Sequence, residues 1–145
     1  MRAEPMVVLL VEDDPGDALI ATEALERVSG AHRVHVVGDG QEALDFLRRH
    51  GKYAEAPRPG LILLDLNMPR MDGREALALI KSDPVLRLIP VVVFTTSASP
   101  DDVIASYANH ANAYVTKPME LDSLEAAVRA IGTFYAETAR LPSSV

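Results

Sequence analysis

The sequence predicts an α/β fold in which helices cover both faces of a parallel sheet. Three near-continuous apolar runs of strand length cover residues 6–11, 61–64 and 91–94, and strands that are buried on both faces have this composition. Segments with apolar residues at helical spacing lie between these runs and after the last one. Because parallel strands are joined by right-handed crossovers, the alternation predicts a doubly wound sheet of five strands with five helices.

Two shorter segments complete the predicted sheet. Residues 33–37 and 113–116 are shorter strand candidates than the three apolar runs, and they also lie between helical segments. We expect residues 113–116 to form an edge strand.

The first three predicted helices follow three of these strands. We interpret Asp17 as the N-cap of the first helix and Gly30 as its stop signal. Residues 41–49 and 73–81 each place their apolar side chains on one side, which is typical of amphipathic helices.

The last two helices also have start signals. Ser99 is the expected N-cap of the fourth helix, because Pro100 and two acidic residues follow it in the first turn. The fifth helix is expected to begin near Leu121 and to carry a single apolar stripe. Residues 51–59 contain two prolines and are interpreted as a long surface connection.

We expect residues 1–145 to form one domain with a core from about residue 6 to 137. A chain of 145 residues with 48% hydrophobic composition can bury a single core without disulfides or structural metal. Repeats and breaks in composition that would mark a second domain are absent from the sequence.

Composition and charge exclude several classes of function. A formal net charge of -7 argues against a nucleic-acid partner, because phosphate binding requires a basic surface. The sequence has no cysteine, which excludes disulfides and thiolate chemistry. Its apolar runs are too short to span a membrane, and its first residues are too few and too polar for a signal peptide. We therefore expect a cytoplasmic protein without a membrane partner.

Polar side chains follow four of the five predicted strands. Glu12 and Asp13 follow the first strand, Asp65 the third, Thr95 the fourth and Lys117 the fifth. Ligands of open α/β sheets bind beyond the carboxyl ends of the strands, so these side chains are expected to converge at one edge. Carboxylates that lie close together repel one another, and Mg²⁺ is the usual cation that relieves this repulsion.

The same residues fit a phosphoryl group beside the ion. Mg²⁺ is often completed by phosphate oxygens, and a lysine and a threonine hydroxyl can each contact a phosphoryl oxygen, the roles expected of Lys117 and Thr95. A carboxylate can attack phosphorus, and Asp65 is the best nucleophile because it ends the most central strand. The backbone carbonyls of the loop that contains Asn67 and Gly73 are placed to reach the metal.

These motifs resemble the receiver domains of response regulators in two-component signalling. The resemblance covers about residues 6–135, and four motifs in order at matching strand ends make it specific. They are Glu12-Asp13, the stretch from Leu63 through Asp65 to Gly73, Thr95, and the stretch from Tyr114 through Lys117 to Pro118. The resemblance implies the flavodoxin-like strand order 2-1-3-4-5 and a single receiver domain without an output domain.

The resemblance also implies a Mg²⁺ site. In it, Asp13 binds the ion directly, Asp65 shares it, and Asn67 offers its backbone carbonyl. Glu12 stands where many receivers have Asp, and it would act either directly or through water.

The resemblance further assigns roles in phosphorylation. Asp65 is the implied phosphoacceptor, and Lys117 is the implied contact to the phosphoryl group, with a bond to Pro118 that is commonly cis in this family. Thr95 is the implied switch hydroxyl, and Tyr114 is the implied aromatic that turns inward behind it. The protein would then catalyse only its own phosphorylation and dephosphorylation.

A narrower resemblance concerns stand-alone receivers that serve bacterial phytochrome histidine kinases. It rests on residues 11–17, 51–59, 94–97 and 111–118. It implies a sensor histidine kinase, a bacterial phytochrome, as the partner. It also implies a homodimer through the surface made by the fourth helix, the fifth strand and the fifth helix.

Two other functions compete with this interpretation. Phosphatases of the haloacid-dehalogenase type also use an aspartyl nucleophile, but they place a second acid two residues after it, where this chain has Asn67. A receiver fold can also bind partners without phosphorylation, although such proteins tend to lose an acid or the lysine. This chain keeps them all.

Overall fold

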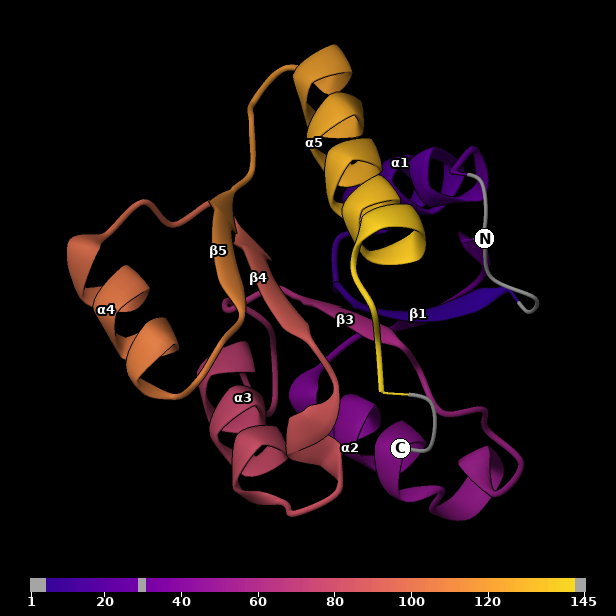
Figure 1. The fold of residues 1–145 in the computed structure, drawn as a ribbon. Helices are drawn as coiled ribbons and strands as arrows, with labels where there is room; N and C mark the ends of the chain where they lie inside the picture. Colours follow the sequence, from indigo (N-terminus) through magenta and orange to yellow (C-terminus); the bar gives the residue numbers. More distant parts are fainter. Residues whose placement is uncertain (1–4, 29–30, 143–145) are drawn as a thin grey trace.

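A computed structural model of the chain, which describes residues 5–28 and 31–142, has a central five-stranded sheet with helices around it (Figure 1). The strands are β1 (Met6–Val11), β2 (Ala31–Val37), β3 (Leu61–Leu64), β4 (Val91–Thr95) and β5 (Ala113–Thr116). All neighbouring strands pair in parallel, and the order across the sheet is β2-β1-β3-β4-β5. The predicted doubly wound sheet and its strand order are confirmed.

Helices cover both faces of this sheet. They are α1 (Pro15–Glu26), α2 (Gly40–Arg48), α3 (Gly73–Ser82), α4 (Pro100–Ala108) and α5 (Leu121–Thr133), with short 3-10 turns η1 (Gly51–Tyr53) and η2 (Leu86–Leu88) and a π-helical turn η3 (Phe134–Thr138) after α5. Helices α1 and α5 pack together on one face, α2 and α3 pack together on the other, and α4 lies beside β5 (Figure 1).

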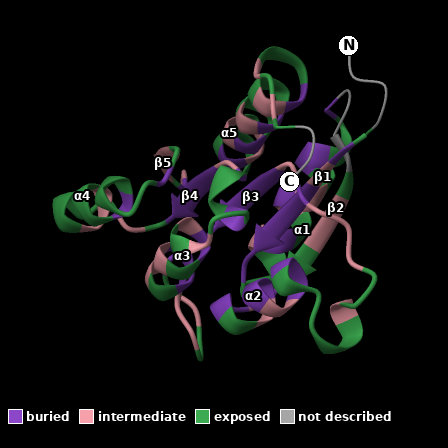
Figure 2. Cartoon of the chain, turned by 60° about the horizontal axis from the view of Figure 1, so that its bottom comes forward, coloured by how far each residue is buried: buried purple, intermediate pink, exposed green. Residues whose placement is uncertain are grey.

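Successive strand residues point to opposite faces of the sheet and pack into two separate hydrophobic cores. Leu9, Ile62 and Val93 belong to the core under α2 and α3, whereas Leu10 and Leu63 belong to the core under α1 and α5. The central strands are buried on both sides, as their continuous apolar sequence predicts (Figure 2). Each fully buried leucine contributes about 1.5–3 kcal/mol to the stability of the folded state. The strand ends that carry the polar residues are therefore held by a tightly packed core.

The predicted start of the first helix is wrong by three residues. The N-cap is Asp14, whose side chain accepts hydrogen bonds from the backbone N–H groups of Gly16 and Asp17, and Pro15 occupies the first helical position. Asp17 lies inside the helix, where its carboxylate is free to point toward the strand ends. The predicted stop at Gly30 lies outside the described residues.

The remaining boundaries agree with the sequence to within two residues, with three local differences. The connection over residues 51–59 contains the turn η1. Ser99 occupies the N-cap position of α4, but its side chain makes no capping hydrogen bond. The described residues contain no cis peptide bond, so the bond between Lys117 and Pro118 is trans. The cis bond that the resemblance implies is therefore wrong for this structure.

Among the described residues, no helix combines the length and the apolar composition that crossing a membrane requires.

Candidate functional site

Side chains that follow β1, β3 and β5 meet at the carboxyl edge of the sheet, and Thr95 ends β4 at the same edge. Backbone hydrogen bonds fix their positions: the N–H of Glu12 donates to the carbonyl of Val37, the N–H of Asp65 donates to the carbonyl of Val11, and the N–H of Lys117 donates to the carbonyl of Thr95. The backbone of each of these three residues is therefore still hydrogen-bonded to the neighbouring strand. This is the convergence that the strand order predicts.

Three carboxylates in this cluster are close enough to share one metal ion. Glu12, Asp13 and Asp65 each offer an oxygen atom, and these atoms lie within 4.8 Å of one another. Glu12 and Asp65 are buried, whereas Asp13 is exposed. A group of oxygen donors that is open to water on one side suits Mg²⁺, which retains several water ligands. The residues present thus fit the predicted ion.

Lys117 lies in the middle of this acidic cluster. Its buried Nζ atom lies 2.5 Å from Oε1 of Glu12, 3.1 Å from Oδ2 of Asp65 and 3.1 Å from Oδ2 of Asp17. Burial alone would lower the pKa of Lys117, but the hydrogen bond and charge of Glu12, with the other two acids, raise it above its ordinary value. The lysine is therefore charged and balances part of the negative charge.

Glu12 is held by two donors at once. Its Oε1 atom accepts from Lys117, and its Oε2 atom accepts from the backbone N–H of Asp14 at 3.0 Å. Burial raises the pKa of the Glu12 carboxyl above its ordinary value, and both hydrogen bonds act in the opposite direction. The bond to the charged Lys117 ties this carboxylate to the lysine.

Asp17 is a member of the cluster that sequence reasoning assigned to a helix cap. It reaches Lys117 from the first turn of α1, one hundred residues away in sequence. A signal for this role exists, because Pro15 favours the first helical position, which leaves Asp14 as the cap.

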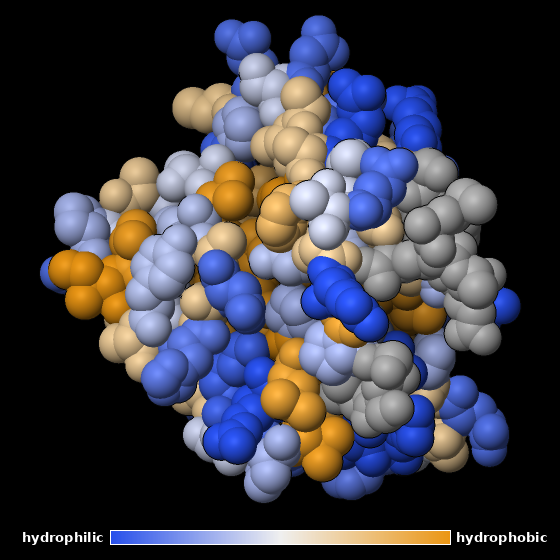
Figure 3. Space-filling model, viewed as in Figure 1, coloured by the Kyte–Doolittle hydropathy of each residue, from blue (hydrophilic) through white to orange (hydrophobic). Residues whose placement is uncertain are grey.

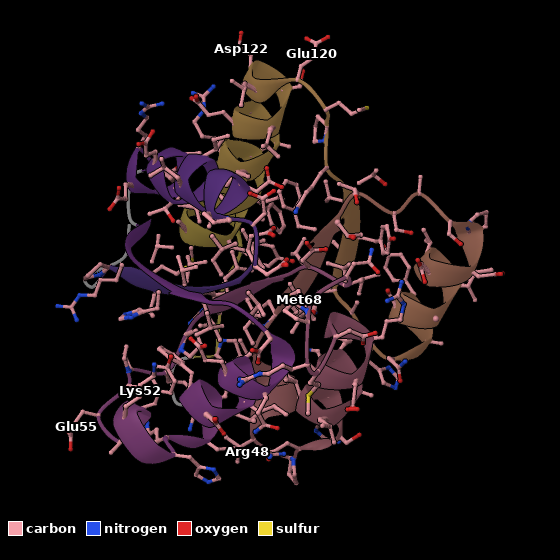
Figure 4. All side chains as sticks on the ribbon, turned by 180° about the vertical axis from the view of Figure 1, so that it is seen from behind. Arg48, Lys52, Glu55, Met68, Glu120 and Asp122 are labelled. Carbon is pink, nitrogen blue, oxygen red and sulfur yellow. The ribbon has the colours of Figure 1, made fainter. Side chains whose placement is uncertain are left out.

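The loop after β3 is pressed closely onto Asp65. The backbone N–H of Asn67 lies 3.4 Å from Oδ1 of Asp65, and the N–H of Gly73 donates to the carbonyl of Leu66 at 2.8 Å. Asp72 caps α3 by accepting from the two N–H groups that follow Gly73. In Figure 4 the label on Met68 marks this loop beside the strand ends.

Thr95 and Tyr114 are joined through the loop after β4. Thr95 is fully buried, and its Oγ1 atom lies 3.4 Å from the backbone nitrogen of Ser97. The hydroxyl of Tyr114 donates to the carbonyl of Ser97 at 2.8 Å, and its ring packs partly against the core. The two residues predicted to act together thus contact the same residue of one loop.

Arg74, Asp102 and Ser97 form a connected group near the site that was not predicted from the sequence. Arg74, on α3, pairs with Asp102, on α4, and Ser97 donates its hydroxyl to that same carboxylate. By contrast, Glu120 and Asp122 at the start of α5 point away from the body of the protein, so they lie outside the cluster (Figure 4).

Comparisons with known proteins agree with this geometry. Residues 8–129 match the family model described as the response regulator receiver domain. The chain is 49% identical over 140 residues to the response regulator Rcp1 of Synechocystis, an alignment that covers 97% of this chain and 95% of that protein.

Two solved structures are similar over almost their whole length. The phosphorylated cyanobacterial phytochrome response regulator RcpA superposes with a TM-score of 0.93 at 50% identity, covering 96% of this chain and 99% of that one. The Mn²⁺-bound form of Rcp1 superposes with a TM-score of 0.92 at 49% identity, covering 96% and 100%.

Proposed function

The chain belongs to the response regulator receiver domain family, and from that premise we propose that it accepts a phosphoryl group from a sensor histidine kinase on Asp65 in a Mg²⁺-dependent reaction. Members of this family are signalling proteins of two-component systems. The likeness to RcpA, a cyanobacterial phytochrome response regulator, supports a kinase of the bacterial phytochrome type. We propose that the reaction takes place in the cytoplasm. We propose a single receiver unit with a core from about residue 6 to 137, whose output is a change of its own surface.

One observation carries this proposal: a buried lysine contacts Asp65 inside a cluster of carboxylates at the carboxyl edge of the sheet. Phosphoryl transfer needs mainly positioning and charge neutralisation, and this cluster supplies both. We assign the metal ligands to Asp13, to Asp65 and to the backbone carbonyl of Asn67. Glu12 completes the set directly or through water. Mg²⁺ bound there would neutralise charge on the transferring phosphoryl group.

The chemistry is a displacement at phosphorus. A carboxylate oxygen of Asp65 forms a bond to phosphorus while the bond from phosphorus to the kinase histidine nitrogen breaks, and that nitrogen then takes up a proton. Lys117 neutralises one phosphoryl oxygen, and the hydroxyl of Thr95 donates a hydrogen bond to another. Hydrolysis of the aspartyl phosphate later returns the carboxylate and releases phosphate.

Acetyl phosphate with Mg²⁺ tests the site assignment directly. We expect one labile, hydroxylamine-sensitive phosphoryl group on the wild-type protein, detected by intact mass, and none on Asp65→Asn. Asp45→Asn, which alters another acidic residue on the exposed side of α2, is the matched control and should be labelled normally. Label that persists on Asp65→Asn would refute the assignment, and repeated turnover of unrelated phosphate esters would favour the phosphatase.

The same assay can identify the kinase. Phosphotransfer should be fastest from a phytochrome-type histidine kinase when kinases of the same genome are compared side by side. Faster transfer from a kinase without a phytochrome sensor would contradict the proposal of a phytochrome-type kinase. It would not affect the assignment of Asp65 as the phosphoacceptor.

We further propose that the output surface is formed by α4, β5 and α5, and that it pairs two copies of the chain. Exposed apolar side chains support this, because Ile104 is 67% exposed, Leu121 is 64% exposed and Met119 is fully exposed. Figure 3 shows apolar surface over α4. Thr95 and Tyr114 connect the site to this surface through Ser97.

Light scattering with and without acetyl phosphate tests the pairing. Ile104→Glu should abolish the dimer, whereas Leu88→Glu, on η2 and similarly exposed, should not. Lys117→Ala should retain Mg²⁺ binding while uncoupling phosphorylation from any change in dimer formation. Dimers of unchanged strength in Ile104→Glu would exclude this surface.

A further inference from the structure

Arg74, at the start of α3, contacts both helix α4 and the loop after β3. Its Nε and Nη2 atoms donate to the two carboxylate oxygens of Asp102 at 3.1 and 3.0 Å. Its Nη1 atom lies 3.3 Å from the side-chain oxygen of Asn67. A guanidinium that is bound bidentately on one side and holds another acceptor on the other has a fixed orientation. Arg74 thus ties α4 to the loop after β3.

Both partners of this arginine lie one step from the reacting groups. On one side, the backbone N–H of Asn67 lies 3.4 Å from Oδ1 of Asp65. On the other side, Asp102 accepts the hydroxyl of Ser97 at 2.6 Å, and the backbone N–H of Ser97 lies 3.4 Å from Oγ1 of Thr95. A continuous series of contacts therefore runs from the carboxylate of β3 to the hydroxyl of β4.

The charges in this series reinforce its geometry. The hydrogen bonds from Arg74 and Ser97 keep the pKa of Asp102 below its ordinary value, so this carboxylate stays ionised at neutral pH. The guanidinium is more than a third exposed, so the pair adds little to global stability. The arginine instead links α4 to the loop after β3.

We propose that Arg74 is a positioning residue for the phosphoryl chemistry of Asp65, acting on Asn67 directly and on the loop of Thr95 through Asp102. This rests on the proposed function and names a residue outside the cluster that controls its rate. Groups that neutralise a transferring phosphoryl group must be placed within a fraction of an ångström. Loosening them slows both phosphorylation and hydrolysis, because the same groups contact the phosphoryl oxygens in both directions.

Arg74→Met tests the proposal, with Arg70→Met as the matched control. Arg70 also forms an arginine–aspartate pair through an exposed guanidinium, but its partner is the buried carboxylate of Asp39, the N-cap of α2. In Arg74→Met, the rate constants of phosphorylation by acetyl phosphate and of hydrolysis should both fall by about threefold or more. Calorimetric Mg²⁺ affinity should fall less than the rate constants, because the carboxylates of the metal site do not contact this arginine and only the carbonyl of Asn67 belongs to the loop that it holds.

The control separates positioning from general damage. Arg70→Met should retain both rate constants, and Arg74→Lys, which keeps the charge but loses the fork, should be slowed like Arg74→Met. Unchanged rate constants in Arg74→Met, or an equal loss in Arg70→Met, would overturn the inference. If the wild-type protein takes no phosphoryl group on Asp65, the proposed function fails, and the inference that rests on it fails too.

A mutant cycle that compares Arg74→Met in two backgrounds distinguishes positioning from a purely structural role. Asn67→Ala combined with Ser97→Ala removes both side-chain links from the arginine–aspartate pair to the site. In that background, Arg74→Met should have no further effect on either rate constant. A structural contribution of Arg74 would lower the rates by the same factor in both backgrounds, and that result would contradict positioning.

Discussion

A Cβ atom added to Gly73 would lie 1.9 Å from the carbonyl oxygen of Asp65. The first turn of α3 therefore packs directly on the backbone of the proposed phosphoacceptor, with room for a hydrogen atom and nothing larger. The obstruction is backbone, so a rotamer change elsewhere cannot relieve it.

Gly73→Ala should therefore disturb both stability and the site. We expect the free energy of unfolding to fall by about 2 kcal/mol or more, because α3 or the strand end must shift. Phosphorylation by acetyl phosphate should slow in the folded fraction. Gly38→Ala is the matched control, since an added Cβ there meets no atom within 4 Å. Equal stability of the two variants in urea denaturation would show that α3 moves without cost.

Lys117→Ala should destabilise the metal-free protein and increase its response to Mg²⁺. Removing the lysine leaves Glu12 and Asp65 buried without their cation, which costs about 3 kcal/mol. Mg²⁺ should restore more stability in this variant than in the wild type, because it relieves the same repulsion. Lys81→Ala, in which a half-buried lysine far from the site loses its bonds to carbonyls, should not change the Mg²⁺ response. A Mg²⁺ response equal to that of the wild type in Lys117→Ala would contradict this account.

Asp39 should contribute stability that is lost in acid. Burial would raise the pKa of its carboxyl, but the N–H of Glu42 and the guanidinium of Arg70 together lower it below the ordinary value of 3.8. Its contribution is therefore complete above about pH 4 and disappears as the pH falls through the lowered pKa. Asp39→Asn should cost about 1 kcal/mol at pH 7 and progressively less toward pH 2. A difference that does not depend on pH would indicate that the charge is irrelevant.

Tyr53 should titrate well above an ordinary tyrosine. Burial, together with the carboxylate of Glu42 that accepts its hydroxyl at 2.8 Å, raises the pKa of Tyr53 to about 12. The difference between the ultraviolet titrations of the wild type and Tyr53→Phe isolates this phenol. Glu42→Gln should lower its pKa while leaving it above 10, the ordinary value, because burial remains. A normal titration in the wild type would mean that η1 opens away from α2.

The sequence was most informative where one local pattern decides the outcome. Residues 61–64 have the continuous apolar composition of a strand that is covered by helices on both faces, and all four are buried in the sheet. Placing Glu12, Asp65 and Lys117 at one edge then follows from parallel strands, whose carboxyl ends coincide.

Contacts between distant segments could not be predicted in the same way. Arg74 and Asp102 are 28 residues apart, and each alone is an ordinary charged residue on a helix. Asp17 was assigned to a cap because it precedes an apolar stripe, yet its partner Lys117 comes from the far end of the chain. Such pairings depend on how the helices are turned on the sheet, which periodicity does not specify.

Lys117 occupies a position that gives it two successive partners. Before phosphorylation its ammonium group is already bound to Asp65, and afterwards it is proposed to bind the phosphoryl oxygens. The free energy with which Lys117 binds the phosphoryl group is therefore an exchange energy, because the hydrogen bond from Lys117 to Asp65 must break first. When this exchange energy is small, the protein returns more readily to its starting state once the phosphoryl group leaves. The contact between Lys117 and Asp65 thus lowers the driving force for activation and also makes the signal reversible.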